Sequence, residues 1–555
     1  MISPSTAPSQ AQSGLPSRTL LGLTALTLIA LPILTTLYLA LGAGTSIWPH
    51  LLRTVLPGSI RDTLLLMLGV GALTLIAGTS CAWLITMYRF PGRDLLDRLL
   101  VLPLAMPTYI TAYAYVELLD YAGPVQRAAR ALFGTTSPRD SWFPDIRSLG
   151  GAIFVMAAVL YPYVYLSARA SFVQQSICVL EVARTLGRTS LGAFWSVALP
   201  LARPALAAGV ALALMEAMGD LGAVQYLGVQ TLSASIASTW LQRGSLGGAA
   251  QIALVALLFI VALYFIERSA RGNGRIAATT GRVRPIPFAE LRGARGWIAL
   301  ALCSLPVLTG FIIPAALLVE HAVRNVTEAA TPAFWRAAWH SVALSGVAAL
   351  TCTALGLALA FARRAAPDRL AATAVRLAGL GYAIPGTVLA LGLLIPLAAF
   401  DNRLDALMRS LFGISTGLLI SGTLVILVIA YTIRFLTVSL GALDAGFDRL
   451  SPNLDAASRT LGETAASTLR RVHLPLLVPP LGAATLLVFV DCMKELPATI
   501  LLRPFNFDTL ATHVYSYAAL EQFDRAAPGA LAIVLVGLVP ILLLHNAIAG
   551  GRAGR

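Results

Sequence analysis

Four carboxylates interrupt long apolar stretches of the sequence, and they form two pairs with the same spacing. Glu216 precedes Asp220 by four residues, and Asp491 precedes Glu495 by four residues. A charged side chain inside a membrane span costs roughly 2.5–3.5 kcal/mol on insertion scales, so each of these residues requires a reason. Because i,i+4 side chains share one face of a helix, the spacing predicts an acidic lining for a translocation path. Such a lining favours a cation or a partly hydrated metal ion.

The same residues also fit a structural role at helix ends. The spans could fray at Gly222 and Pro497, where Tyr, Thr or backbone N–H groups would hydrogen-bond the acids. Lys494 could neutralise its neighbour Glu495, and like charges one turn apart repel each other. Two hypotheses, a translocation path or helix ends, therefore stay open for one set of residues: Glu216, Asp220, Asp491, Glu495 and Lys494.

Nothing in the sequence is typical of an enzyme. Lys494 is the only lysine and is followed by an acid, so the Gly-Lys-Ser/Thr of a nucleotide-binding Walker A loop cannot form. The six histidines are scattered, and His473 is predicted to be a packing or interface residue rather than a metal ligand. Packed, inert thiols are expected for the five cysteines, which are Cys81, Cys178, Cys303, Cys352 and Cys492.

The elements that position these residues follow from the composition. Hydrophobic residues make up 57% of the 555 positions and charged residues 12%, against about 25% charged residues in soluble domains. Apolar runs long enough to cross a bilayer recur along the whole chain. They predict an all-α polytopic membrane protein with about twelve spans, at 20–43, 60–88, 99–119, 150–175, 203–225, 249–267, 297–320, 340–362, 377–399, 416–442, 477–500 and 528–549. The first run is too long for a signal-peptide core and is predicted to be a retained anchor.

The net charge of +14 is distributed as expected for a membrane protein rather than a nucleic-acid binder. Basic residues gather in alternate loops and above all in the central linker, which contains Arg268, Arg271, Arg275, Arg282, Arg284, Arg292 and Arg295. By the positive-inside rule, this bias predicts that the linker and both termini are cytoplasmic.

The two halves of the chain repeat one another. Residues 181–204 and 456–479 match at an offset of 275, and residues 102–115 match 380–393 at an offset of 278. The second offset also aligns Pro107 with Pro385 and Thr63 with Ser341. Because each copy holds six spans, both enter the membrane from the same side, which predicts parallel repeats related by an axis along the membrane normal. The expected organisation is a tail at 1–19, a first repeat at 20–267, a linker at 268–296 and a second repeat at 297–550.

The best-matched block of each copy is the cytoplasmic loop between its fourth and fifth spans. The residue types favour a short helix, a sharp turn at Gly187 or Gly462, and a second helix. We expect Pro200 and Pro475 to end that second helix before the next span begins. One such loop could merely stabilise the bundle, but two at matched positions favour docking elements for a two-fold symmetric partner.

These loops resemble the EAA loops of ATP-binding-cassette (ABC) importer permeases of the binding-protein-dependent type. The first copy carries the pattern at Glu181, Ala183, Gly187, Leu199 and Pro200. The second carries Ala456, Ala457, Gly462, Leu474 and Pro475, with its nearest acid, Asp455, one residue early. The resemblance implies a type I importer permease fold in a bacterial inner membrane, with coupling helices for two separate ATPase subunits and a periplasmic substrate-binding protein. It also implies that the partner subunits use the ATP and that this chain binds no cofactor.

Three longer stretches, at 113–126, 215–229 and 493–511, resemble the fused ferric-iron branch of these permeases, with thiamine, sulfate and phosphonate permeases as near relatives. On that basis Tyr109, Tyr113 and Tyr115 could meet Fe³⁺, although an interfacial aromatic belt accounts for them as well. Met218 and Met493 also correspond and are expected to be packing residues.

Two other classes remain as alternatives. A twelve-helix secondary transporter is also built from parallel six-helix halves, but its signature loop would lie between spans 2 and 3. There, residues 88–93 form only a generic basic turn. A membrane scaffold would have no need of matched carboxylates. A fused permease is expected to act as one chain per complex.

Overall fold

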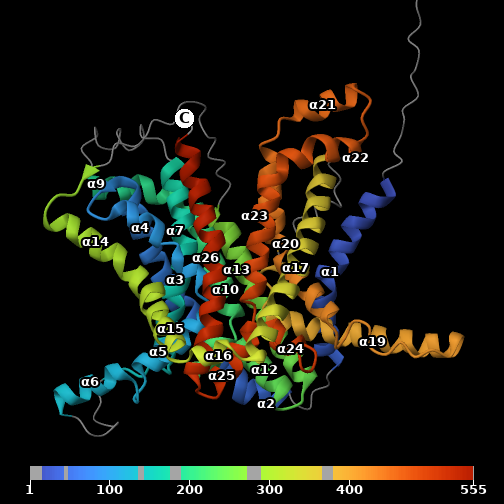
Figure 1. Ribbon diagram of the computed structural model, residues 1–555, viewed down its shortest axis with the longest axis horizontal. Helices are drawn as coiled ribbons and strands as arrows, with labels where there is room; N and C mark the ends of the chain where they lie inside the picture. The colour runs from blue at the N-terminus through green and yellow to red at the C-terminus, as the bar shows by residue number, and fades with distance from the viewer. Residues whose placement is uncertain are drawn as a thin grey trace, which may run out of the picture.

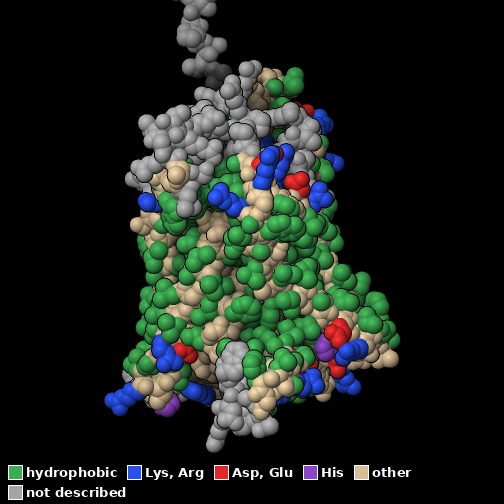
Figure 2. Space-filling view, turned by 90° about the vertical axis from the view of Figure 1, so that its left-hand side faces the viewer, with side chains coloured by type: hydrophobic (Ala, Val, Ile, Leu, Met, Phe, Trp, Pro, Cys, Tyr) green, Lys and Arg blue, Asp and Glu red, His purple; other side chains and the backbone are tan. Residues whose placement is uncertain are grey.

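The computed structural model describes residues 15–42, 48–134, 143–174, 189–271, 289–365, 379 and 381–553. Within these ranges eleven helices are long and apolar enough to cross a membrane, or twelve if one bent pair counts as a span. The chain is therefore an all-α polytopic membrane protein, as predicted. Figure 2 shows a broad band of hydrophobic side chains between two zones where charged side chains gather. Large apolar side chains such as Leu68, Leu258 and Trp297 are exposed, as expected for a surface that faces lipid.

The helices of the first half are labelled in Figure 1. They are α1 (Leu15–Gly42), α2 (Trp48–His50), α3 (Leu56–Met87), α4 (Arg93–Leu99), α5 (Thr108–Leu119), α6 (Pro124–Phe133), α7 (Leu149–Gln174), α9 (Ser190–Ala193), α10 (Leu199–Gly219), α11 (Gly222–Tyr226), α12 (Leu232–Leu241) and α13 (Leu246–Arg271). A 3₁₀ turn (Leu102–Ala105) and π-helical turns (Leu51–Val55 and Phe194–Ala198) join them.

The second half contains α14 (Ala294–Val307), α15 (Ile313–Arg324), α16 (Val326–Ala329), α17 (Pro332–Ala365), α19 (Gly386–Phe412), α20 (Leu424–Asp448), α21 (Pro452–Thr460), α22 (Ala465–Thr468), α23 (Leu474–Met493), α24 (Pro497–Leu502), α25 (Leu510–Ala519) and α26 (Phe523–Ala553). Its π-helical turns are Leu308–Ile312 and Leu469–His473. Two short strands, β1 (Tyr88–Arg89) and β2 (Ala289–Glu290), pair in parallel, with Tyr88 opposite Ala289.

The third predicted span is not a single helix. The segments Arg93–Ala105 and Thr108–Phe133 meet at an angle of 96°. Met106 and Pro107 between them are extended, with ψ of 113° and 141°, because a residue before proline is pushed out of the helical region and proline lacks an N–H. The matched helix α19 likewise begins directly after an extended proline, Pro385. The predicted span at 377–399 is thus replaced by a helix that starts nine residues later and runs to Phe412.

The prediction that Pro200 and Pro475 end a helix is wrong. Each Leu-Pro pair lies in the first turn of its helix and follows a five-residue π-helical turn, so the helix continues through it. A π turn absorbs one extra residue in the hydrogen-bond ladder, and this relieves the missing N–H and the ring clash of proline. The resulting continuous helices are Phe194–Gly219 and Ala465–Met493.

Equivalent residues make the same hydrogen bond within each half. The N–H of Leu232 donates to Thr63 Oγ1 at 3.0 Å, and the N–H of Leu510 donates to Ser341 Oγ at 2.6 Å. Both the donors and the acceptors are separated by the offset of 278 that the sequence predicts. Helices α12 and α25, which begin at these donors, have the same length and the same threonine N-cap.

The halves interlock through their first helices. In Figure 1, α1 lies beside α17 and α20 of the second half, while α14 lies beside α3 and α4 of the first half. Two glycines permit further close crossings, of α1 with α19 and of the turn Leu308–Ile312 with α7. A Cβ on Gly392 would lie 2.3 Å from the carbonyl oxygen of Pro32, and a Cβ on Gly310 would lie 2.0 Å from that of Ala158. Neither position accepts a side chain without movement of the backbone.

Candidate translocation path and coupling loops

The four predicted acids line one cavity of about 80 Å³. At roughly 30 Å³ per water molecule, this volume holds a few waters. The break after α10 and the break after α23 supply its two opposed walls. The wall residues correspond at the offset of 275 and are Glu216, Gly219, Asp220, Leu221 and Gly222 on one side and Asp491, Lys494, Glu495, Leu496 and Pro497 on the other.

The acids of a pair do not share one helix face, contrary to the prediction from their spacing. Helix α10 ends at Gly219, and α23 ends at Met493, so Asp220 and Glu495 lie just beyond their helices. Asp220 Oδ1 accepts the N–H of Ala223 at 2.8 Å, and Glu495 Oε1 accepts the N–H of Ala498 at 2.9 Å. Each acid therefore binds the first turn of the next short helix, where unpaired N–H groups favour a negative charge.

The first pair of acids is held by hydroxyl groups. The Tyr382 hydroxyl donates to Glu216 Oε1, and the Thr108 hydroxyl donates to Asp220 Oδ2. Among the described residues, neither acid has a basic side chain within ion-pair distance. Thr108 is the first residue of α5, so the break at Pro107 is what brings this hydroxyl to the cavity.

The second pair of acids is held by cations. Lys494 Nζ lies 2.9 Å from Asp491 Oδ1, and Arg434 Nη1 lies 3.2 Å from Glu495 Oε1. The expectation that Lys494 neutralises Glu495 is therefore wrong: α23 ends at Met493, the C-cap residue Lys494 pairs with Asp491 in the last turn, and Glu495 pairs with Arg434. Arg434, on α20, is 8% exposed and was missed as a site residue. Its position inside an apolar span was the available signal, since an intramembrane arginine requires a partner.

The helix-end hypothesis accounts for the hydrogen bonds of the acids, and the translocation path stays a prediction. The acids make the hydrogen bonds expected at helix ends, and they also gather around one cavity. The described lining contains two more acids than basic residues, and both basic residues come from the second half. The negative charge without an ionic partner is thus concentrated on Glu216 and Asp220.

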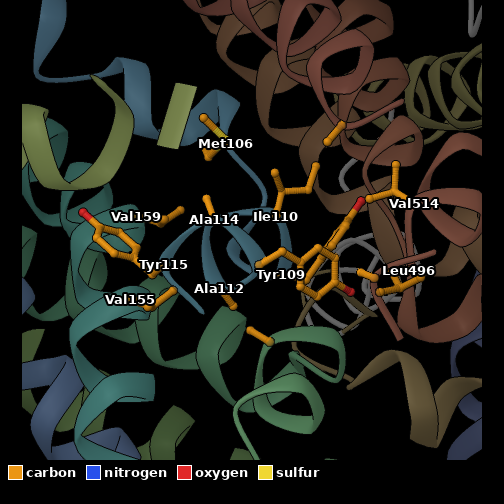
Figure 3. Packing of buried hydrophobic residues seen from close by; sticks show 14 of the residues in the cluster. Met106, Tyr109, Ile110, Ala112, Ala114, Tyr115, Val155, Val159, Leu496 and Val514 are labelled. Atoms are coloured by element: carbon orange, nitrogen blue, oxygen red, sulfur yellow. The ribbon is translucent and has the colours of Figure 1, made fainter. Parts of the chain in front are cut away.

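The tyrosines of α5 divide between the cavity and the outer packing. Tyr109 lines the cavity, and Figure 3 shows it on the side of α5 near Leu496. Tyr115 lies on the other side, toward Val155, and its hydroxyl donates to the carbonyl oxygen of Thr309 at 2.7 Å. Met218 and Met493 are buried in apolar clusters, in agreement with a packing role. No cluster of three His, Cys, Asp or Glu side chains suited to hold a metal occurs within the described ranges.

The second loop predicted to couple to an ATPase consists of α21, α22 and the turn between them, and it projects from the molecule (Figure 1). Gly462 in that turn has φ of +80°, a conformation that glycine adopts without strain. Ala456, Ala457 and Leu461 are exposed, and Leu461 is 82% exposed. Leu474 and Pro475 form the first turn of α23. An apolar surface is therefore presented at the end of the molecule where α9 also lies (Figure 1).

In the first loop, Glu181, Ala183 and Gly187 lie outside the described residues. Leu199 and Pro200, which follow them, are half-buried at the start of α10. The matched short helices α9 and α22 have the same length at the offset of 275.

Asp455 of the second loop is held within the chain. Arg364 donates to Asp455 Oδ2 from Nε at 3.0 Å and from Nη2 at 2.6 Å, and His473 Nε2 lies 3.1 Å from Asp455 Oδ1. Burial alone would raise the pKa of Asp455, but the bonds and charge of Arg364 outweigh it and hold that pKa below its usual range. His473 is fully buried between the rings of Phe361 and Phe447, as expected for a packing residue. This acid therefore anchors α21.

Comparisons with known proteins agree with this architecture. Residues 74–271 match the family model described as "Binding-protein-dependent transport system inner membrane component". The chain is 26% identical to the Fe(3+)-transport system permease protein FbpB 2 of Haemophilus influenzae, over 88% of this chain and 89% of the relative. It is 24% identical to the probable ABC transporter permease protein y4fN of Sinorhizobium fredii, over 84% and 83%.

A shorter relative matches part of the chain. The sulfate transport system permease protein CysT of Salmonella typhimurium is 34% identical over 27% of this chain and 52% of its own length. These likenesses set aside the secondary transporter and the scaffold as classes. Residues 74–271 are thus similar to the family of binding-protein-dependent transport system inner membrane components, and the chain is a multi-pass inner-membrane permease subunit of an ABC importer.

Proposed function

We propose that this permease imports ferric iron and that the cavity between α10 and α23 is part of its translocation path. The observation that carries the proposal is the convergence of Glu216, Asp220, Asp491 and Glu495 on one cavity. A lining with an excess of carboxylates attracts a cation and repels an anion, and low polarity around it strengthens both effects. A relative that matches 88% of this chain carries Fe(3+) in its name.

An oxyanion is the second candidate, because permeases named for sulfate, 2-aminoethylphosphonate and molybdenum match parts of the chain. Arg434 and Lys494 are the groups that an oxyanion would use. Each is already bound to a carboxylate, Glu495 and Asp491 respectively. An entering anion would have to replace these partners and leave four acids nearby, so the geometry favours a cation.

The energy would come from two separate ATPase subunits. One would bind the loop around Glu181 and Gly187, and the other would bind α21, α22 and Gly462. Because α10 and α23 continue directly from these loops, movement of an ATPase would reach the two walls of the cavity. ATP would be used by the partners, with no cofactor bound by this chain.

The remaining organisation follows from the same proposal. The termini and the linker at 268–296 would face the cytoplasm, between repeats at 20–267 and 297–550. A periplasmic binding protein would deliver the substrate at the opposite end, where α6, α12, α24 and α25 lie (Figure 1).

Uptake of radiolabelled substrates tests this function. The chain would be expressed with its ATPase and binding protein in a strain that lacks the operon, and supplied in turn with Fe³⁺, thiamine, sulfate and 2-aminoethylphosphonate. Accumulation of iron alone is expected, together with its loss when the ATPase is inactivated. Accumulation of another substrate in place of iron would refute the assignment to ferric iron.

A further inference from the structure

Two buried tyrosine hydroxyls on α5 make no hydrogen bond with any described residue. Tyr109 is 4% exposed and Tyr113 is 1% exposed, and neither hydroxyl has a partner among the described residues. Leaving a buried donor unpaired costs about 1–3 kcal/mol. Other buried tyrosines are satisfied, since Tyr115 donates to Thr309 and Tyr161 donates to Leu100 at 2.9 Å. The two hydroxyls are thus not engaged by the described residues and could bind a group from outside the chain.

The same two side chains belong to a continuous row of rings. The ring centroids of Tyr109 and Tyr113 are 5.8 Å apart, and those of Tyr113 and Tyr226 are 4.5 Å apart. Tyr226 is half-buried, and the Arg147 guanidinium lies 5.1 Å from its centroid. The row thus leads from the cavity, where Tyr109 lies, to partly exposed residues.

The outer end of the row is rich in carboxylates. Arg147 Nη2 lies 2.8 Å from Glu521 Oε1, and Arg147 Nε lies 3.4 Å from Asp120 Oδ2. Burial first, and then the negative charges of Glu521, Glu117 and Asp120, raise the pKa of Tyr226 against the opposing charge of Arg147. Acids therefore lie at both ends of the tyrosine row.

Close packing fixes the inner end of the row. A Cβ on Gly222 would lie 2.8 Å from the Cβ of Tyr109 and 2.6 Å from Leu496 Cδ2. Tyr109 is thus pressed against the first residue of α11, beside the acids of the cavity. Its position in the second residue of α5 follows from the break at Pro107.

We propose that Tyr109, Tyr113 and Tyr226 form a row of oxygen ligands along which a hard trivalent cation passes between the outer surface and the acidic cavity. This inference rests on the proposed import of ferric iron. Hard cations are bound by oxygen ligands, and a phenolate is an anionic oxygen donor of this kind. On ligation a phenol O–H bond breaks, an Fe–O bond forms, and the proton leaves to water, with no change in the oxidation state of the iron.

Absorption spectroscopy tests this row on the purified full chain in lipid nanodiscs. The probe is Fe³⁺ supplied as its nitrilotriacetate complex, which leaves coordination positions free, and the signal is the visible charge-transfer band of iron bound to phenolate. The variants are Tyr109→Phe and Tyr113→Phe, which remove only the unpaired hydroxyls. Tyr115→Phe is the matched control, because this buried tyrosine of the same helix uses its hydroxyl within the protein.

We expect the band in the wild type and in Tyr115→Phe, and loss of most of its intensity in the double variant Tyr109→Phe/Tyr113→Phe, which retains only Tyr226 of the row. Loss of these ligands should lower ATP-dependent iron uptake by about tenfold or more, the scale on which removal of metal-site partners acts. The melting temperature separates this role from a structural one. It should stay unchanged in the double variant, which loses no internal bond, and fall in Tyr115→Phe.

Each other outcome contradicts the inference. If the wild type shows no band, or if the double variant retains the band and the uptake of the wild type, the tyrosines do not bind the ion. If the double variant retains the band and the uptake, the proposed import of iron is not contradicted, and only the role of the tyrosines is. If the chain accumulates another substrate and no iron, the proposed function fails, and the tyrosine row fails with it.

Discussion

Glu216 and Asp491 occupy matched positions in the two halves, yet they are held by different chemistry. Glu216 accepts a hydroxyl from Tyr382, whereas Asp491 is paired with Lys494. The charge of Glu216 is therefore available to a passing cation, while that of Asp491 is largely compensated. This difference makes the contributions of the two acids to transport separable by substitution.

We expect Glu216→Gln to lower iron uptake by at least about tenfold and Asp491→Asn to lower it less. One charge at 4 Å is worth about 4 kcal/mol at an effective dielectric constant of about 20, so loss of the uncompensated acid matters more. Gln retains an acceptor for the Tyr382 hydroxyl, so folding should be preserved. Uptake by each variant and by the double variant is the measurement. Normal uptake by a correctly folded double variant would remove these acids from the path.

Arg434 allows a prediction about stability. Arg434→Met leaves Glu495 buried without its cation and should destabilise the protein by about 3–5 kcal/mol. The double variant Arg434→Met/Glu495→Gln removes both charges and should recover much of that loss. Thermal unfolding of the purified variants measures both. Equal stability of the single and double variants would mean that the ion pair contributes little.

For single residues, the sequence identified the buried acids but not all of the cations that pair with them. The bond between Asp491 and Lys494 follows an i,i+3 spacing that neighbours on a helix satisfy, so it could have been foreseen. The bond between Arg434 and Glu495 joins two different spans. Only the packing of α20 against α23 brings these residues together, and no local pattern encodes that packing.

Among the elements, the apolar runs predicted the spans closely, and the prolines produced the departures. Pro107 breaks the third span, whereas Pro200 and Pro475 lie within continuous helices. A proline has several structural outcomes, namely a break, a kink or a π turn, and surrounding contacts decide among them. The sequence therefore marks where a helix is perturbed, but the tertiary structure determines how.

Leu461 offers a test of the second coupling loop. This side chain is 82% exposed on the turn between α21 and α22, so Leu461→Asp should leave the fold intact. If the loop binds an ATPase subunit, the variant should copurify with less of that subunit and stimulate ATP hydrolysis less. Leu520→Asp, at an exposed leucine outside the loop, is the control. Full ATPase binding by Leu461→Asp would place the docking surface elsewhere.

Gly392 tests the crossing of α1 over α19. A methyl group there would lie 2.3 Å from the Pro32 carbonyl oxygen, so Gly392→Ala should destabilise the protein by about 1–3 kcal/mol, as overpacking does. Gly346→Ala in α17 meets no atom within 4 Å and is the matched control. Its stability should equal or exceed that of the wild type. Thermal unfolding in detergent distinguishes the two, and equal effects would contradict the close approach.

For the whole molecule, the duplication predicted two matched acidic pairs, and the structure brings both pairs to one cavity. The sequence did not predict which helices cross from one half to the other, because apolar surfaces of similar hydrophobicity do not specify their partners. Small residues such as Gly310 and Gly392 permit the crossings, but many other glycines do not mark one. The overall symmetry was therefore predictable, and the interlocking of the halves was not.

A molecule that already contains both walls should need no second copy. We expect one permease chain with two ATPase subunits in the purified complex, as measured by native mass spectrometry. The wild-type chain with a catalytically inactive ATPase should give the same composition, because assembly precedes hydrolysis. Two permease chains per complex would contradict a self-sufficient pair of repeats.

The crossing of the first helices has a consequence for how the protein is made. Chains are synthesised from the N-terminus, so α1 enters the bilayer long before α19, the helix that it crosses at Gly392. Helices α14 and α15, in contrast, emerge when the first half already exists, and the pairing of β1 with β2 can guide them. The order of insertion therefore differs from the order of packing. Helix α1 can already pack against α13 of the first half, where the Gln251 amide donates to the Ala40 carbonyl oxygen at 3.3 Å, but the face of α1 that contacts α19 stays in lipid until the second half is inserted.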